Sequence, residues 1–322
     1  MRCEKAKAPS KVILLGEHGA VYGHPAVAIP LREPSAEASV CWTGDGQPYR
    51  IELPDLNAAW AYGDAQMPPE IVPFVKIIDL ARERHGKSIV TTGWTLKVSS
   101  AIPTGCGLGS SAAVSAAALK AVFRYFGIHV KAQTLSELVF ETEKLHHGTP
   151  SGIDNTVIAM GVPILFRKGR GAECLDAPEE PLFLVIGYTG IRHSTRAVIA
   201  EVARARAAEP AKYDALFAEI GALALKGADA LPRGHAGELG ELMNKTQELL
   251  RQVGVSCPEL EALVTAARGA GALGAKLTGA GRGGCMVAVT DGTDSAEAVR
   301  AAVAAAGSKL TVVTGIPGRL RE

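Results

Sequence analysis

The sequence predicts an α+β protein of two domains, on three observations. The chain has 322 residues, more than a single hydrophobic core usually serves. Short apolar runs of strand length are interspersed with longer stretches of helical spacing. A polar stretch containing two prolines, DAPEEPLF, separates two such sets of elements near residue 178. We therefore expect one domain in residues 1–178 and a second in residues 179–322.

The first half is expected to mix strands and helices. KVILL (11–15) is a short branched apolar run closed by Gly16, which is typical of a buried strand. An alanine-rich stretch that reaches Gly127 predicts a helix, and a second helix is stopped by Gly148 and Pro150. The expected strands are 11–15, 26–31, 49–53 and 94–103, with further sheet in 156–167; the expected helices are 71–86, 110–128 and 134–148. Residues 43–70 otherwise read as loops, because Gly, Pro, Asp and Asn are frequent there.

The second half predicts helices packed on one face of a mostly antiparallel sheet. LFLVIGY, GAKLT and CMVAV are apolar runs of strand length, and most of the intervening residues have helical spacing. The expected strands are 182–188, 274–278, 285–289 and 309–314, and the expected helices are 194–206, 209–230, 235–252, 258–269 and 295–306.

Composition excludes several classes of protein. The 34 basic and 33 acidic residues balance, so neither nucleic acid nor an anionic membrane is expected as a partner. The chain has no apolar run of about 18 residues, and its first apolar run is too short for the core of a signal peptide. The six cysteines lack metal-ligand spacing, which favours reduced thiols in a cytoplasmic protein over a disulfide framework.

Two of the three glycine-rich segments imitate other motifs. HGKS (85–88) ends like a phosphate-binding P-loop, but Ala81 stands where the first glycine belongs, and the segment follows a helix. A helix cap followed by a turn, with Lys87 in solvent, explains it better. GAGRGG (279–284) lies between two strands, whereas a dinucleotide site needs a strand followed by a helix. It is either a hairpin turn or a backbone loop that approaches a ligand closely.

The third segment, PTGCGLGSSAA (103–113), follows a strand and opens into a helix. The free amides at a helix N-terminus favour an anion in front of them. Ser110 and Ser111 could instead be capping residues, but a cap needs one polar side chain and leaves the three glycines unexplained. Close approach of a triphosphate accounts for all three.

These segments together resemble the GHMP kinases, the small-molecule kinases named for galactose, homoserine, mevalonate and phosphomevalonate. KAPSKVILLGEHGAVYG (7–23), PTGCGLGSSAA and KLTGAGRGGC (276–285) are similar to the three sequence blocks of the family, in the same order. The resemblance implies a ribosomal-protein-S5-like α/β domain and a C-terminal ferredoxin-like α+β domain, with the active site in the cleft between them. HGTPSGIDN (147–155) is similar to the catalytic loop of members that phosphorylate mevalonate. The expected reaction is therefore transfer of the γ-phosphoryl group of ATP to the primary hydroxyl of mevalonate.

The resemblance also implies a role for individual residues. Asp154 would be the catalytic aspartate and Lys11 its cationic neighbour, while Ser111 and Glu143 would bind Mg²⁺. The residues implied in ATP binding are Pro103, Gly105, Gly107, Leu108, Gly109, Ser110, Ser111, Ala112, Gly279 and Gly281. The residues implied near mevalonate are Glu17, His18, Ser151, Gly152, Ser194, Thr195 and Thr278. Arg282 stands where members often have glycine, and we expect its side chain in solvent.

The chemistry agrees with these roles independently of the resemblance. Phosphoryl transfer mainly requires alignment of an oxygen nucleophile and neutralisation of developing charge, which a carboxylate, a lysine, a helix N-terminus and Mg²⁺ can supply. Glu143 follows Val139 and Phe140 by one turn, so partial burial is expected, although a surface ion pair is the alternative. Whether Asp154 removes the hydroxyl proton or only orients the hydroxyl stays open. His146 and His147 are adjacent on a helix, so their side chains diverge by about 100° and cannot easily share a metal ion.

Other functions remain possible on the sequence alone. One is another member of the family, such as phosphomevalonate kinase, a sugar kinase, a mevalonate 3-kinase or a related decarboxylase. Another is a nucleotide-binding relative without activity, but Lys11, Ser111, Glu143 and Asp154 are all present. A homodimer is expected.

Overall fold

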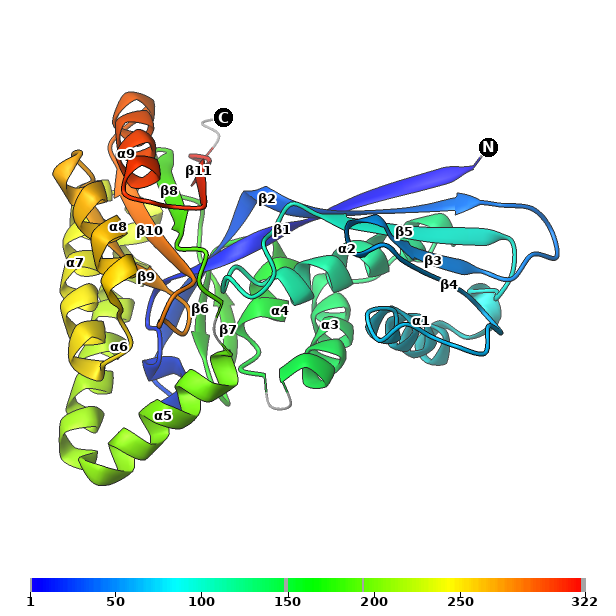
Figure 1. Ribbon diagram of the computed structural model, residues 1–322, viewed down its shortest axis with the longest axis horizontal. Coiled ribbons are helices and arrows are strands. Elements are labelled where there is room, and N and C mark those ends of the chain that lie inside the picture. Colours follow the sequence, from blue (N-terminus) through cyan, green and yellow to red (C-terminus); the bar gives the residue numbers. More distant parts are fainter. Residues whose placement is uncertain (1, 148–149, 193, 320–322) are drawn as a thin grey trace. The chain divides into compact units, whose positions relative to one another are not determined.

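The computed structural model describes residues 2–147, 150–192 and 194–319 (Figure 1). The chain forms two compact units, neither of which is continuous in sequence. Unit 1 takes Met1–Ser10, Pro34–Thr104 and Gly109–Gly161, and unit 2 takes Lys11–Glu33, Gly105–Leu108 and Val162–Glu322. The linear boundary near residue 178 stays a prediction.

The longest strand in the sheet of unit 1 continues into unit 2. Strands β1 (Cys3–Leu15) and β2 (Ala26–Trp42) pair with each other and contribute residues to both units. Within unit 1, β2 pairs antiparallel with β5 (Trp94–Ser100), and β5 pairs parallel with β3 (Arg50–Leu53). Strand β3 in turn pairs antiparallel with β4 (Ala58–Ala61).

Strand β4 and the short 3₁₀ helix η2 (Pro54–Leu56) lie in the stretch that composition predicted as loop. The prediction was wrong for β4. Its sequence, AAWA, does not alternate between apolar and polar residues, so the pattern of a half-buried strand is absent. Only Trp60 and Ala61 are buried.

Four helices complete unit 1: α1 (Val72–His85), α2 (Ser110–Tyr125), α3 (Ala132–His147) and α4 (Ile153–Met160). Helix α2 contacts β5 and all three other helices. The many alanines on its buried side allow these elements to approach closely. A 3₁₀ turn, η3 (Gly86–Ser88), follows α1 at HGKS and confirms the interpretation as a helix cap, although the side chain of Lys87 lies outside the described residues.

The prediction of sheet over residues 156–167 was wrong in its first half. Helix α4 occupies residues 153–160, between Gly152 and Gly161, which both have left-handed backbone. Only β6 (Ile164–Arg167) is extended. A short apolar run such as TVIAM fits a buried strand and a buried helix equally well, so periodicity could not decide.

Unit 2 begins with pairings of the first part of β2. Strand β6 pairs antiparallel with β2, from Ala26 opposite Phe166 to Ala28 opposite Ile164. Strand β7 (Gly171–Cys174), which the sequence did not predict, pairs with β6. All four of its residues are exposed, so it carries no apolar pattern.

A four-stranded antiparallel sheet, with the order β11-β8-β10-β9, forms the rest of unit 2. Helices α7, α8 and α9 contact this sheet, which confirms the predicted arrangement of helices and antiparallel strands (Figure 1). Its strands are β8 (Leu182–Tyr188), β9 (Gly274–Thr278), β10 (Cys285–Thr290) and β11 (Leu310–Ile316). The helices of unit 2 are η1 (Gly19–Tyr22), α5 (Thr195–Ala208), α6 (Pro210–Arg233), α7 (Ala236–Val253), α8 (Pro258–Gly269) and α9 (Thr293–Ala305). Every residue of β9 and β10 is buried.

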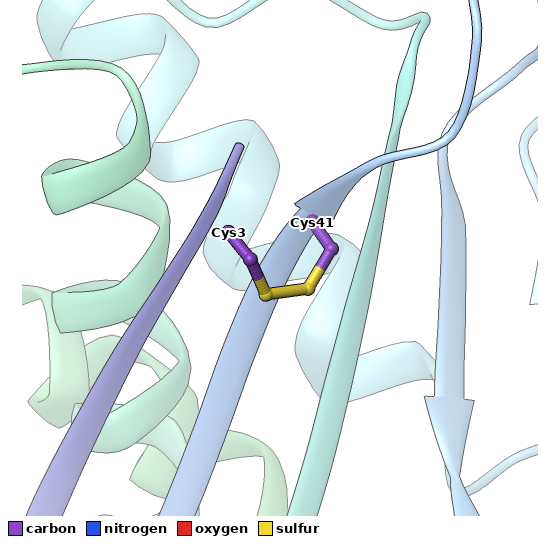
Figure 2. Close-up of a disulfide and its surroundings, with 2 residues drawn as sticks. All are labelled: Cys3 and Cys41. Carbon is purple, nitrogen blue, oxygen red and sulfur yellow. A yellow bond between two sulfur atoms is a disulfide. The ribbon is translucent and has the colours of Figure 1, made fainter. Parts of the chain in front are cut away.

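Cys3 and Cys41 form a disulfide within unit 1 (Figure 2). The expectation of six reduced thiols was therefore wrong for this pair. The Trp42 amide donates to the Arg2 carbonyl across β1 and β2, which places Cys3 opposite Cys41 at the neighbouring position. Side chains approach most closely at such a position of an antiparallel pair, and the two Cα atoms are 4.1 Å apart. The other four cysteines are free thiols.

Over the described part of the chain, no helix combines the length and apolar character needed to cross a membrane.

Candidate functional site

Segment 103–113 contributes to both units. Gly105–Leu108 belongs to unit 2, whereas Pro103, Thr104 and the residues from Gly109 onward belong to unit 1. Gly105, Gly107 and Gly109 all have positive φ, which explains why this turn requires glycine.

Helix α2 begins without a side-chain cap. Gly109 is its N-cap residue, with a φ of 74°, and no side chain among the described residues caps it. Ser110 and Ser111 already lie in the first turn, and the Ser110 hydroxyl lies 3.4 Å from the Ile102 carbonyl to which it donates. The alternative that these serines cap the helix is therefore wrong. The first-turn amides remain suited to an anion, as the sequence predicted.

Glu143 lies on a stretch of α3 that packs against the start of α2. Glu143 is only 2% exposed, which confirms burial rather than a surface ion pair. The hydroxyl of its neighbour Thr142 donates to the Ser115 hydroxyl at 3.1 Å. Ser115 lies one helical turn after Ser111, so this stretch of α3 packs on the first two turns of α2.

Asp154 lies in the first turn of α4 and is half-buried. Two contacts fix this turn. The Ile153 amide donates to the Ser151 hydroxyl at 3.3 Å, and the Asn155 amide group donates to the Ser136 hydroxyl of α3 at 2.9 Å. Asn155 is 5% exposed and therefore anchors the turn that carries Asp154. Sequence reasoning missed this role, although Asn155 stands directly after Asp154.

The segment before this turn is only partly described. Helix α3 reaches His147, but the side chains of His146 and His147, and all of Gly148 and Thr149, lie outside the described residues. The helix stop predicted at Gly148 also falls there.

In unit 2, the glycine loop 105–108 packs against the turn between β9 and β10. A Cβ added to Gly107 would lie 3.6 Å from the Thr278 carbonyl oxygen, and one added to Gly284 would lie 3.1 Å from the Cys106 carbonyl oxygen. Gly281 is more restricted, because its Cβ would lie 2.1 Å from the Val255 carbonyl oxygen. GAGRGG is thus a hairpin turn between antiparallel strands, and its glycines permit backbone-to-backbone packing.

Lys11 lies beside the same loop. Its backbone amide donates to the Leu108 carbonyl at 3.0 Å, and the residue is 3% exposed. The ammonium group is close enough to Glu17 and Cys106 to stabilise their ionised forms.

Two alternate residues of β9 bind the backbone of β1. The Thr278 hydroxyl accepts a hydrogen bond from the Ile13 amide at 3.1 Å and donates to the Ile13 carbonyl at 3.0 Å. Thr278 is 1% exposed, so this hydroxyl primarily joins the strands. Its predicted contact with mevalonate stays a prediction.

Lys276, two residues earlier, forms a buried ion pair with Glu17. Its ammonium group donates to Glu17 Oε1, to the Leu277 carbonyl at 2.6 Å and, more weakly, to the Ile13 carbonyl at 3.5 Å. Burial raises the pKa of Glu17, and the charge of Lys276 opposes that rise; burial lowers the pKa of Lys276. Sequence reasoning missed Lys276. The available signal was a lysine at the centre of the otherwise uncharged strand GAKLT.

His18 follows Glu17 with a constrained backbone and a buried ring. Its φ is 60°, which is uncommon for a residue other than glycine. Its Nε2 lies 2.9 Å from the Ala280 carbonyl, and burial lowers the pKa of the ring. The neutral ring therefore donates from Nε2 and fixes the 279–284 turn.

Three of the predicted residues, Ser194, Thr195 and Arg282, lie at the surface. Ser194 is the N-cap residue of α5, where its hydroxyl accepts from the Ala197 amide at 3.4 Å, and Thr195 starts the helix. Both are exposed. Arg282 is exposed and lies 3.8 Å from Glu201, which confirms the expectation that it points to solvent.

The fold and the glycine-rich loops define a class of protein, the phosphotransferases that act on an alcohol group. The description "GHMP kinases N terminal domain" matches residues 73–161, and "GHMP kinases C terminal" matches residues 228–309. The chain belongs to the GHMP kinase family.

Among curated relatives, the chain is similar to mevalonate kinases. It is 36% identical to the mevalonate kinase of Thermococcus gammatolerans, with 98% of each chain covered. It is 37% identical to that of Pyrococcus horikoshii, over 89% of this chain and 88% of the relative.

Solved structures agree. The L. major mevalonate kinase in complex with R-mevalonate matches with a TM-score of 0.83 and 29% identity, covering 98% of this chain and 97% of that one. The Methanococcus jannaschii mevalonate kinase matches with a TM-score of 0.81 over 98% of both chains, and its 24% identity supports the fold alone. The predicted two-domain GHMP kinase fold is thereby confirmed.

Proposed function

We propose that this chain is an ATP-dependent mevalonate kinase, which transfers the γ-phosphoryl group of ATP to the primary hydroxyl of (R)-mevalonate. The products are 5-phosphomevalonate and ADP, in isoprenoid biosynthesis. The observation that carries the proposal is the identity of 36% to a curated mevalonate kinase over 98% of both chains. The HGTPSGIDN segment, whose last three residues begin α4, supports the choice of mevalonate within the family.

The reacting groups are proposed to be Asp154 and Lys11. Asp154 accepts a hydrogen bond from the mevalonate hydroxyl and takes its proton as transfer proceeds, and Lys11 neutralises charge beside it. The first-turn amides of α2 and the 105–109 glycines bind the phosphates of ATP, together with Gly279 and Gly281.

Mg²⁺ fits the available ligands. Ser111 and Glu143 provide hard oxygen atoms, and Mg²⁺ usually binds one or two protein groups together with phosphates and water. Among the described residues no group of three or more His, Cys, Asp or Glu side chains could hold a metal ion. When bound, the ion neutralises charge on the phosphates.

Mevalonate is proposed to contact residues that lie near the proposed reacting groups in the sequence. Glu17 and His18 follow Lys11, and Ser151 and Gly152 precede Asp154. The exposed start of α5, at Ser194 and Thr195, and the end of β9, at Thr278, complete the proposed set.

A coupled ADP-release assay tests the proposal. Purified protein is assayed with ATP and Mg²⁺ on mevalonate, phosphomevalonate and galactose, and only mevalonate is expected to support rapid turnover. Asp154→Asn and Asp154→Ala are expected to lower kcat by at least about 100-fold, the usual contribution of a positioned acid or base. Asp229→Asn, an exposed position on α6, is the matched control and should keep full activity.

Other outcomes would identify the alternatives. Preference for another alcohol would make the chain a different GHMP kinase. ATP binding without turnover on any alcohol would make it a non-catalytic relative. Normal turnover by Asp154→Asn would exclude Asp154 both as base and as positioning group.

We also propose a homodimer in the cytoplasm, without nucleic acid or membrane partners. Sedimentation velocity of the purified protein tests the dimer. A disulfide is uncommon in a reducing cytoplasm, so alkylation of thiols during cell lysis tests the location: Cys3 and Cys41 should be modified there and protected after purification in air.

A further inference from the structure

Resting on the proposed function, we propose that Lys276 is a positioning residue of the mevalonate site, which holds the Glu17 carboxylate with one oxygen directed to substrate. Lys276 itself does not contact substrate. It is fully buried, and its three ammonium donors have three acceptors, at Glu17, Leu277 and Ile13.

The two oxygens of Glu17 are in different situations. Oε1 accepts from Lys276, whereas Oε2 is buried and has no hydrogen-bond partner among the described residues. A buried carboxylate oxygen without a donor is costly, and a ligand hydroxyl would offset that cost. The ion pair with Lys276 fixes which oxygen is left for the ligand.

The surrounding charges favour an ionised Glu17. Lys276 faces it from β9 and Lys11 from β1, while His18, next in the chain, is buried and neutral. Without Lys276, the rise in the pKa of Glu17 that burial causes is opposed only by weaker effects, a backbone hydrogen bond at Glu17 itself and the charge of Lys11. Glu17 would then take up a proton at higher pH and lose its character as a pure acceptor.

The attachment of β9 to β1 does not depend on Lys276 alone. Thr278 lies on the same side of β9, two residues along, and makes both of its hydrogen bonds to Ile13. Loss of the Lys276 ammonium should therefore affect Glu17 more than the attachment of β9 to β1, which Thr278 maintains. This separation makes a positioning role distinguishable from a structural one.

The first test is the kinetics of Lys276→Met. We expect KM for mevalonate to rise by about tenfold or more, which corresponds to loss of one charge-assisted hydrogen bond, with KM for ATP within about twofold. The acid limb of the kcat/KM profile for mevalonate should move to higher pH. An unchanged KM for mevalonate in a folded Lys276→Met protein would overturn the proposal.

Two further variants separate positioning from folding. Glu17→Gln/Lys276→Met removes both charges and should recover the thermal stability lost in Lys276→Met, while KM for mevalonate stays high. Recovery of both properties would show a purely structural pair. In Lys276→Ala, added methylammonium should partly restore affinity for mevalonate and methanol should not; equal effects would contradict the role of the charge.

A last measurement is independent of turnover. Isotope-edited infrared spectroscopy of the ligand-free protein follows the Glu17 carboxyl group, which should protonate at higher pH in Lys276→Met than in the wild type. Identical titration in the two proteins would overturn control of Glu17 by Lys276. Failure of the wild type to phosphorylate mevalonate would instead overturn the proposed function, and the infrared result would still decide the role of Lys276.

Discussion

The histidine at position 18 is a neutral, buried group whose proton affinity differs between the folded and unfolded chain. Burial lowers its pKa from 6.5, so the unfolded state binds more protons than the folded state as the pH falls below that value. Stability rises with pH wherever the unfolded state binds more protons. The contribution of His18 is therefore fully present above pH 6.5 and is lost as the pH falls toward its folded pKa.

We expect His18→Asn to remove this dependence. Asparagine tolerates the φ of 60° at this position but does not titrate. Thermal unfolding of both proteins between pH 5 and pH 8, a range chosen to bracket the ordinary histidine pKa, should show a shallower acid-side decline for the variant. Parallel curves would show that His18 does not contribute to the acid-side loss of stability. The other titrating groups, including Glu17, are present in both proteins and cannot cause a difference between them.

Thr278 offers a second test at the scale of one side chain. Thr278→Val should destabilise the protein by about 1–3 kcal/mol, because the amide and the carbonyl of Ile13 both lose a partner. Thr278→Ser keeps the hydroxyl and is the control, expected to lose clearly less. Urea unfolding measures both, and equal losses would contradict a dominant contribution from the hydrogen bonds, because the methyl group would then contribute as much as the hydroxyl.

Sequence could suggest Asp154, Lys11 and Glu143 because each lies in or near a segment with a recognisable pattern. The sequence could not show that Lys276 pairs with Glu17. The two residues are 259 positions apart, and no local spacing, such as i to i+4 on a helix, connects them. Asn155 was missed for the related reason that its anchor, Ser136, is on another helix.

At the scale of elements, the β9–β10 turn depends on backbone packing. Gly281→Ala should cost roughly 2 kcal/mol or more, because alanine would adopt a φ of 81° and place its Cβ against the Val255 carbonyl. Gly237→Ala, on α7 with open space around it, is the matched control and should be neutral or stabilising by up to about 1 kcal/mol. Thermal unfolding compares them, and equal effects would remove the packing argument.

The elements that sequence predicted best are the long helices and the apolar strands bounded by clear breaks. Helices α5 to α9 have enough turns for their period and caps to be recognised, and β8 to β11 are apolar runs between clear breaks. The errors, at α4, β4 and β7, concern elements of eight residues or fewer. At that length tertiary packing decides between helix, strand and loop.

For the molecule as a whole, the Cys3–Cys41 bond predicts a thiol count. Ellman's reagent under denaturing conditions should find four thiols before reduction and six after it. The bond closes a loop over a sequence separation of 38, so reduction should lower the stability by about 4 kcal/mol in the chain-entropy treatment. Cys3→Ser/Cys41→Ser is the control, expected to resemble the reduced protein with or without reductant. Six thiols before reduction would contradict the disulfide.

The interleaved composition of the units limits how this protein can be divided. Unit 2 needs residues 11–33, whose Ile13 and Glu17 satisfy Thr278 and Lys276 of β9. A fragment that begins after residue 178 would keep both β9 side chains and lose their partners, leaving a buried ammonium group uncompensated. Such a fragment cannot be exchanged by itself between related proteins. A chimera that folds has to take β1 and β9 from the same parent, because the side chains of β9 depend on residues in and directly after β1.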